Sequence, residues 1–143
     1  MKKFKKKINF KDKRGFILDI FYKENFNHSA LIHSKKNAVR ANHYHKKTTQ
    51  ITFILSGSCT YYSKKKQSKF INKIKLNKHD YLITNINEIH AYKFSADTDM
   101  IVFSKGLRGG KDYEKDREVK IFPVQLKDEA VNLFRENLKK TIK

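Results

Sequence analysis

The sequence predicts an all-β domain, either a sandwich or a closed barrel, followed by one C-terminal α-helix. Between Phe16 and Phe103 the apolar residues occur in short or alternating runs of strand length, separated by polar turn clusters. The runs recur at intervals of roughly eight to twelve residues, which is typical of all-β sandwiches and barrels. Only near the C-terminus does the apolar period become helical. In chain order, the expected strands are Phe16–Phe21, Ala30–His33, Arg40–His45, Ile51–Leu55, Thr60–Ser63, Lys69–Leu76, Tyr81–Thr84, His90–Phe94 and Met100–Phe103.

The remaining elements also follow from local patterns. Residues 1–12 form a basic N-terminal segment, whose lysine run we interpret as a solvated tail. Ser56-Gly57-Ser58 lies between two aromatic or β-branched runs, which is typical of a hairpin turn. A C-terminal helix is expected over residues 127–142, because Ala130, Val131, Phe134 and Leu138 fall on one helical face. Residues 1–143 show no repeat or linker and are expected to form a single domain.

The composition excludes several classes of protein. The formal net charge of +19 suggests an anionic partner. However, only five of the 33 basic residues are arginine, the residue that recognises nucleic-acid bases through paired hydrogen bonds. No nucleic-acid-binding motif is present, so no nucleic-acid partner is expected. We also expect no membrane span and no secretory signal. The lone cysteine, Cys59, excludes a disulfide framework and fits a cytoplasmic location, with a structural role for its thiol.

Histidines provide the clearest candidate site. Residues two apart in a strand point to the same side, so His43 and His45 should project together, and His90 from another strand could join them. Imidazoles in one pocket can bind a metal or act as an acid and base pair. The same alternation places Arg40 and Tyr44 on the opposite side from His43, unless a β-bulge intervenes.

The spacing of these residues resembles the cupin superfamily. Its first motif runs Gly, five residues, His-x-His, three or four residues, Glu, six residues, Gly, and the corresponding positions here are Asn37, His43, His45, Gln50 and Gly57. Its second motif matches outright only at His90; its other positions fall on His79, Asn85, Asn87 and Phe94. The resemblance implies a cupin double-stranded β-helix, which is a jelly-roll barrel with the C-terminal helix appended.

The resemblance also raises the question of a metal. Metal-binding cupins use the two motif-one histidines, the glutamate and the motif-two histidine, which correspond to His43, His45, Gln50 and His90. A glutamine amide brings no negative charge to a divalent cation, so no cofactor is favoured. Zinc, iron, nickel or manganese remains an alternative at this site.

A longer run narrows the resemblance within the superfamily. Val39-Arg40-x-x-His43-x-His45-Lys46-Lys47-x-x-Gln50 resembles the nucleotide-sugar 3,4-ketoisomerases and the sugar epimerase-like cupins. The segment from Lys111 to Arg117 is also similar to that group. The resemblance implies an enzyme that moves protons on a nucleotide-linked 4-keto-6-deoxy sugar, by 3,4-keto isomerisation or epimerisation, in the synthesis of cell-surface polysaccharide sugars.

On this interpretation the site residues have distinct roles. We expect His43 and His45 to act as the acid–base pair, with Arg40 and Tyr92 as supporting polar groups. The substrate-binding residues are expected to be Tyr44, Gln50, Tyr62 and His90. A homodimer is expected, with strand Phe16–Phe21 exchanged between copies. Two alternatives remain open, namely a metal-dependent dioxygenase or lyase and a sugar-binding cupin without catalysis.

Overall fold

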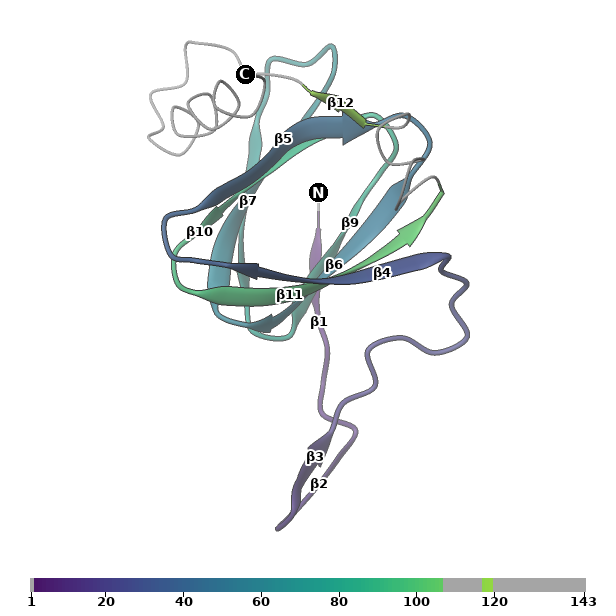
Figure 1. The fold of residues 1–143 in the computed structure, drawn as a ribbon, viewed down its shortest axis with the longest axis vertical. Helices are drawn as coiled ribbons and strands as arrows, with labels where there is room; N and C mark the ends of the chain where they lie inside the picture. Colours follow the sequence, from purple (N-terminus) through teal and green to yellow (C-terminus); the bar gives the residue numbers. More distant parts are fainter. Residues whose placement is uncertain (1, 107–116, 120–143) are drawn as a thin grey trace.

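The computed structural model describes residues 2–106 and 117–119. Two five-stranded antiparallel sheets face each other and enclose a barrel interior (Figure 1). In order across the first sheet, the strands are β1 (Lys3–Lys5), β9 (Asp80–Thr84), β6 (Thr49–Ser56), β11 (Thr98–Lys105) and β4 (His28–Ser34). Across the second, they are β12 (Arg117–Val119), β5 (Val39–His45), β10 (Glu88–Phe94), β7 (Ser58–Lys65) and β8 (Asn72–Asn77). The expected all-β jelly roll is confirmed, and the described residues include no helix long and apolar enough to span a membrane.

Seven of the nine expected strands lie within an observed strand, and two expectations were wrong. The run Phe16–Phe21 enters a strand only at its start, in the hairpin of β2 (Phe10–Asp12) and β3 (Gly15–Ile17). Its last residue, Phe21, instead packs edge-on against Tyr81 and Phe103, so its apolar residues cover a sheet rather than extend one. The run Lys69–Leu76 becomes a strand only from Asn72 onwards. The expected C-terminal helix, residues 127–142, lies outside the described residues.

The N-terminal lysines form a strand rather than the solvated tail we expected. Strand β1 pairs with β9 at the edge of the first sheet. Lys3 and Lys5 both form ion pairs with the carboxylate of Asp80, at 3.5 and 3.1 Å, and Asp80 is almost completely buried. The expectation was wrong because a run of lysines carries no apolar alternation, whereas the strand is held by backbone pairing and by one buried charge.

Asp80 should make a pH-dependent contribution to stability. Burial alone would raise its pKa, but the backbone N–H of Asn77 and the ammonium groups of Lys5 and Lys3 hold that pKa below its usual value. A lowered pKa in the folded state stabilises the fold above the pKa of the unfolded chain, and this stabilisation is lost as the pH falls through the folded pKa. We therefore expect Asp80→Asn to lower the free energy of unfolding at pH 7 by about 1–3 kcal/mol.

Urea denaturation of the wild type and the variant measures this effect. The difference between them should shrink as the pH falls through the folded pKa of Asp80, because the carboxyl group is then protonated in both states. Asp12→Asn is the matched control, because Asp12 forms an exposed ion pair with Arg14 and should change stability by less than about 0.5 kcal/mol. An Asp80→Asn effect as small as that of Asp12→Asn would contradict the prediction.

The barrel interior has a polar end and an apolar end. Strand register pairs Gln50 with both Thr84 and Ser104 at the polar end. At the apolar end the register pairs Cys59 with Leu76 and Phe94, all completely buried. Burial raises the pKa of the Cys59 thiol to about 12, so the thiol stays protonated and does not act as a nucleophile. Two of the predicted histidines, His45 and His90, are buried near Gln50 at the polar end.

The β2–β3 hairpin projects from the barrel as an arm (Figure 1). Within the described part of the chain its two strands pair only with each other. Large apolar side chains on the arm are exposed, at 52% for Phe10, 49% for Phe16 and 58% for Ile17. An exposed apolar hairpin of this kind is a candidate contact surface.

Candidate active site

A β-bulge in β5 determines which side chains reach the barrel interior. His43 pairs with His90, but Ala41 pairs with Ala91, so Asn42 is the extra residue. Ala41 and Asn42 both have positive φ angles, 71° and 65°. Because of this extra residue, Arg40 lies on the same side as His43. Without the bulge, simple alternation would place Arg40 on the opposite side.

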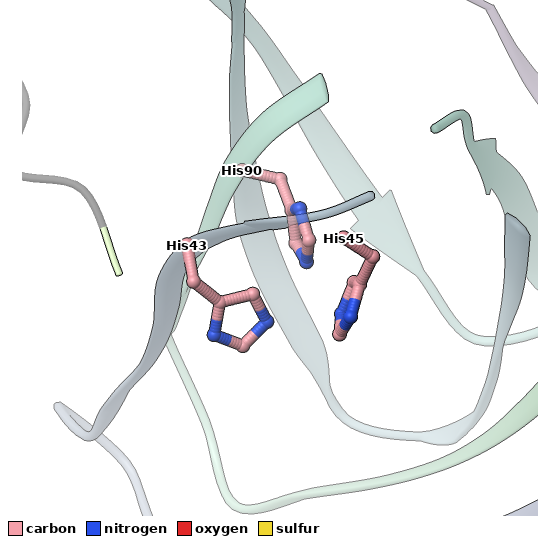
Figure 2. A group of neighbouring side chains, drawn as sticks. All are labelled: His43, His45 and His90. Carbon is pink, nitrogen blue, oxygen red and sulfur yellow. The ribbon is translucent and has the colours of Figure 1, made fainter. Parts of the chain in front are cut away.

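Three histidines meet inside the barrel at its polar end. The ring centroids of His43 and His45 are 4.7 Å apart, and those of His43 and His90 are 4.8 Å apart. Figure 2 shows the three rings directed towards a common space from strands β5 and β10. His45 and His90 are buried, while His43 is partly exposed. The predicted convergence of a third histidine on the His-x-His pair is what the structure shows.

The protonation of His90 is defined by its surroundings. Burial lowers the pKa of His90 to about 3, against the opposing effect of the Glu88 carbonyl, so the ring is neutral. The Nδ1 atom of His90 lies 3.0 Å from the Glu88 carbonyl oxygen, which can only accept a hydrogen bond, so Nδ1 carries the ring hydrogen. The Nε2 atom of His90 therefore presents a lone pair.

The histidines line a small cavity of about 150 Å³. Three further residues with polar groups, Arg40, Gln50 and Tyr92, complete its wall, and apolar side chains from β4, β5 and β11 close it. The lining residues are Ile32, Arg40, Ala41, His43, His45, Gln50, His90, Tyr92, Met100 and Val102. The apolar wall was not predicted from the sequence, although the alternation of Met100 and Val102 along β11 was a signal for it.

Arg40 connects the two sheets beside this cavity. Its Nε atom donates to Ser34 Oγ at 2.6 Å, and one terminal nitrogen donates to the His33 carbonyl oxygen at 2.9 Å. Ser34 and His33 belong to β4, whereas Arg40 belongs to β5. The guanidinium group thus spans the edges of the facing sheets and is exposed to solvent on that side.

Two residues expected to bind substrate lie elsewhere. Tyr44 and Tyr62 pack with Ile89 and Ala91 in a separate apolar cluster and do not line the histidine cavity. Each alternates with residues that face inward, so each side chain points to the opposite face of the sheet. The Nζ atom of Lys66 lies 3.8 Å from the Tyr44 ring centroid. Tyr44 and Tyr62 therefore lie outside the histidine cavity, and their role in substrate binding stays a prediction.

The three histidines have a geometry that fits a metal ion. Their candidate ligand nitrogens all lie within 4.8 Å of one another, and Gln50 lines the same cavity. Three imidazoles and an amide oxygen form a neutral donor set that suits zinc, nickel or ferrous iron better than magnesium or calcium. His43, His45 and His90 would hold such an ion.

Comparisons with known proteins extend these observations. The family model described as FdtA: WxcM-like, C-terminal matches residues 1–122. No curated protein matches the chain by sequence.

Several solved structures share the fold. A dTDP-4-dehydrorhamnose 3,5-epimerase from Sulfolobus tokodaii is 22% identical with a TM-score of 0.67, over 82% of this chain and 77% of the epimerase. QdtA, a sugar 3,4-ketoisomerase from Thermoanaerobacterium thermosaccharolyticum crystallised with TDP, is 17% identical with a TM-score of 0.66, over 96% and 95% of the two chains. A 3,4-ketoisomerase from Helicobacter canadensis is 18% identical with a TM-score of 0.68, over 95% and 96%.

Proposed function

The chain belongs to the family FdtA: WxcM-like, C-terminal, and we propose that it isomerises a nucleotide-linked 4-keto-6-deoxy sugar. The cupin resemblance stated from the two motifs is confirmed by this membership and by the shared fold. The observation that carries the proposal is the convergence of His43, His45 and His90 on one cavity beside Arg40. A cytoplasmic location accords with the single, buried Cys59.

The proposed reaction is a proton shuttle through an enediol. A base takes the proton from C3 while the C4 oxygen becomes protonated, and the C3 hydroxyl then loses its proton as C4 gains one. His43 and His45 provide the base and the acid, with ring centroids 4.7 Å apart. His90 presents its Nε2 lone pair to the same space. Arg40 and Tyr92 line the cavity and would stabilise charge on the sugar oxygens, and Gln50 would orient the sugar through its amide.

The size of the cavity limits which part of the substrate enters it. A space of about 150 Å³ accommodates a sugar ring but not a whole nucleotide sugar. The pyrophosphate and nucleoside therefore remain outside, where the exposed side of Arg40 offers a guanidinium group to an anion. The net charge of +19 would also attract such a substrate, and this attraction should weaken as the salt concentration rises.

Proton NMR in D₂O with a dTDP-4-keto-6-deoxyhexose tests the proposal. We expect deuterium to enter the substrate at C3 and signals of the 3-keto isomer to appear. Exchange at C5 with inversion would instead identify an epimerase of the same substrate class. Binding without exchange at any carbon, with several nucleotide carriers, would contradict the proposal and favour a sugar-binding cupin without catalysis.

The second candidate function is that of a metal-dependent cupin, a dioxygenase or a lyase. It is favoured by the three histidine nitrogens within 4.8 Å of one another. A divalent cation bound there would polarise a substrate oxygen as a Lewis acid. Elemental analysis of the purified protein, with His43→Ala as the control, distinguishes the two functions. One equivalent of metal per chain that is lost in the variant would favour the metal-dependent function.

We also propose that the protein is a homodimer in which the β2–β3 arm contacts a second copy. The arm extends beyond the barrel, and its apolar residues Phe10, Phe16 and Ile17 are exposed. A hairpin of two three-residue strands is unstable in water unless a further surface covers it. A second copy of this chain is a partner with a similarly exposed apolar surface.

Replacing Phe16 and Ile17 together by serine should convert the dimer into a monomer. Both side chains are about half exposed in the single chain, so the change should cost little stability in an isolated copy. Light scattering coupled to size-exclusion chromatography should give twice the mass of one chain for the wild type and one chain mass for the variant. The exposed Leu31→Ser change, on strand β4, serves as the control. A wild type of single-chain mass would contradict the dimer.

A further inference from the structure

Two pairs of hydroxyl groups cross the barrel interior between the sheets. The hydroxyl of Tyr92, on β10, lies 2.8 Å from Thr52 Oγ1, on β6. The hydroxyl of Tyr61, on β7, lies 2.7 Å from Thr84 Oγ1, on β9. All four side chains are buried. None of Thr52, Thr84 and Tyr61 lines the histidine cavity, whereas Tyr92 does.

These hydroxyl pairs lie next to the histidine cluster. The Tyr92 ring centroid is 6.1 Å from that of His90, nearly perpendicular to it, and 5.0 Å from that of Tyr61. Tyr92 is therefore held between the cavity on one side and the threonine of the facing sheet on the other. Its phenolic oxygen is the group through which Thr52 can influence the cavity.

The direction of the hydrogen bond decides what Tyr92 offers to a substrate. Burial raises the pKa of Tyr92, and at 2.8 Å either the Tyr92 or the Thr52 hydroxyl could be the donor. If Tyr92 donated to Thr52, its only hydrogen would be used outside the cavity. If Thr52 donates, the O–H of Tyr92 remains available to a substrate oxygen that gains negative charge.

We propose that Thr52 is a positioning residue, whose hydroxyl donates to the Tyr92 oxygen and directs the Tyr92 O–H towards the substrate. This inference rests on the proposed function, because it assigns Tyr92 the role of hydrogen-bond donor to the enediolate. Thr84 pairs with Tyr61, whose ring packs against that of Tyr92, so a second buried hydroxyl pair lies beside the Tyr92–Thr52 contact.

A double-mutant cycle tests this inference. Thr52→Val keeps the side-chain shape but removes the hydroxyl, and Tyr92→Phe removes the donor itself. We expect Tyr92→Phe to lower kcat by about 100-fold and Thr52→Val by about tenfold, with KM changed by less than about twofold in each. Thr52→Ser, which retains a hydroxyl, should recover most of kcat. The double variant Thr52→Val/Tyr92→Phe should be no slower than Tyr92→Phe, since Thr52 acts through Tyr92.

Other results would overturn the inference. Losses of kcat that multiply in the double variant would show that Thr52 acts independently of Tyr92, and a slow Thr52→Ser variant would show that the methyl group matters rather than the hydroxyl. A wild type without turnover would contradict the proposed function. In that case the free energy of unfolding in urea is measured for the wild type, the two single variants and the double variant. A coupling energy of zero between Thr52 and Tyr92 would then overturn the inferred hydrogen bond between them.

Discussion

His43→Asn and His45→Asn should each lower kcat of the proposed isomerisation by about 10²- to 10⁴-fold, the range that a positioned acid or base contributes. Asparagine can still donate and accept hydrogen bonds, but it cannot exchange a proton with carbon at neutral pH. The two imidazoles adjoin each other in one cavity, so neither can be replaced by water without losing the geometry of proton transfer. KM should change much less than kcat.

The measurement is the rate of deuterium entry at C3, followed by NMR for each variant. His33→Asn is the matched control, because His33 is an exposed histidine on β4 that pairs with Asp99 outside the cavity, and its removal should leave kcat within about twofold of wild type. Circular dichroism of all variants shows whether each is folded, so that a loss of activity can be assigned to the missing imidazole rather than to unfolding. Wild-type exchange rates in both His43→Asn and His45→Asn would exclude these histidines as the acid–base pair.

Gly57→Ala should destabilise the fold by about 3 kcal/mol or more. Gly57 forms the turn between β6 and β7 with a φ angle of +88°, where a side chain is strained. A Cβ atom there would also overlap the Asp97 carbonyl oxygen and Thr98, whose Cα would be only 2.7 Å away. Because these neighbours include backbone atoms, the turn between β10 and β11 would have to move.

Gly15→Ala is the control for the backbone part of this cost. Gly15 also has a positive φ angle, +136°, but a Cβ atom built there meets no atom within 4 Å. We expect Gly15→Ala to cost about 1–2 kcal/mol in urea denaturation, so that the excess in Gly57→Ala measures the overlap. Equal costs for the two variants would show that the turns adapt and that the overlap is relieved.

Local sequence patterns were sufficient to predict most of the barrel and the centre of the site. Alternation along β5 placed His43 and His45 on one side, and the Gly57 turn followed from its neighbours, because both depend on residues close in sequence. The bulge at Asn42 could not be predicted in the same way, since it also requires a positive φ angle at Ala41, for which alanine has no preference. Its consequence for Arg40 becomes visible only in the pairing of β5 with β10.

Long-range contacts explain the remaining differences. Strand β1 depends on Asp80, more than seventy residues away, so the local composition of the lysine run could not reveal it. Tyr62 was assigned to the site although alternation relative to Tyr61 places it on the outer face of its sheet, in the apolar cluster with Tyr44. The hydroxyl pairs of Thr52 and Thr84 connect strands that are not hydrogen-bonded to each other, so no periodicity within one strand predicts them.

The contact between the histidine cavity and the apolar core has a consequence for how this protein can evolve. Tyr92, Met100 and Val102 line the cavity and also belong to the buried cluster that contains Cys59, Leu76 and Phe94. Substitutions at these three positions that change the shape of the cavity therefore also change the packing of the core. New substrate preferences selected along this wall should come with a cost in stability, which substitutions elsewhere in the barrel would have to offset.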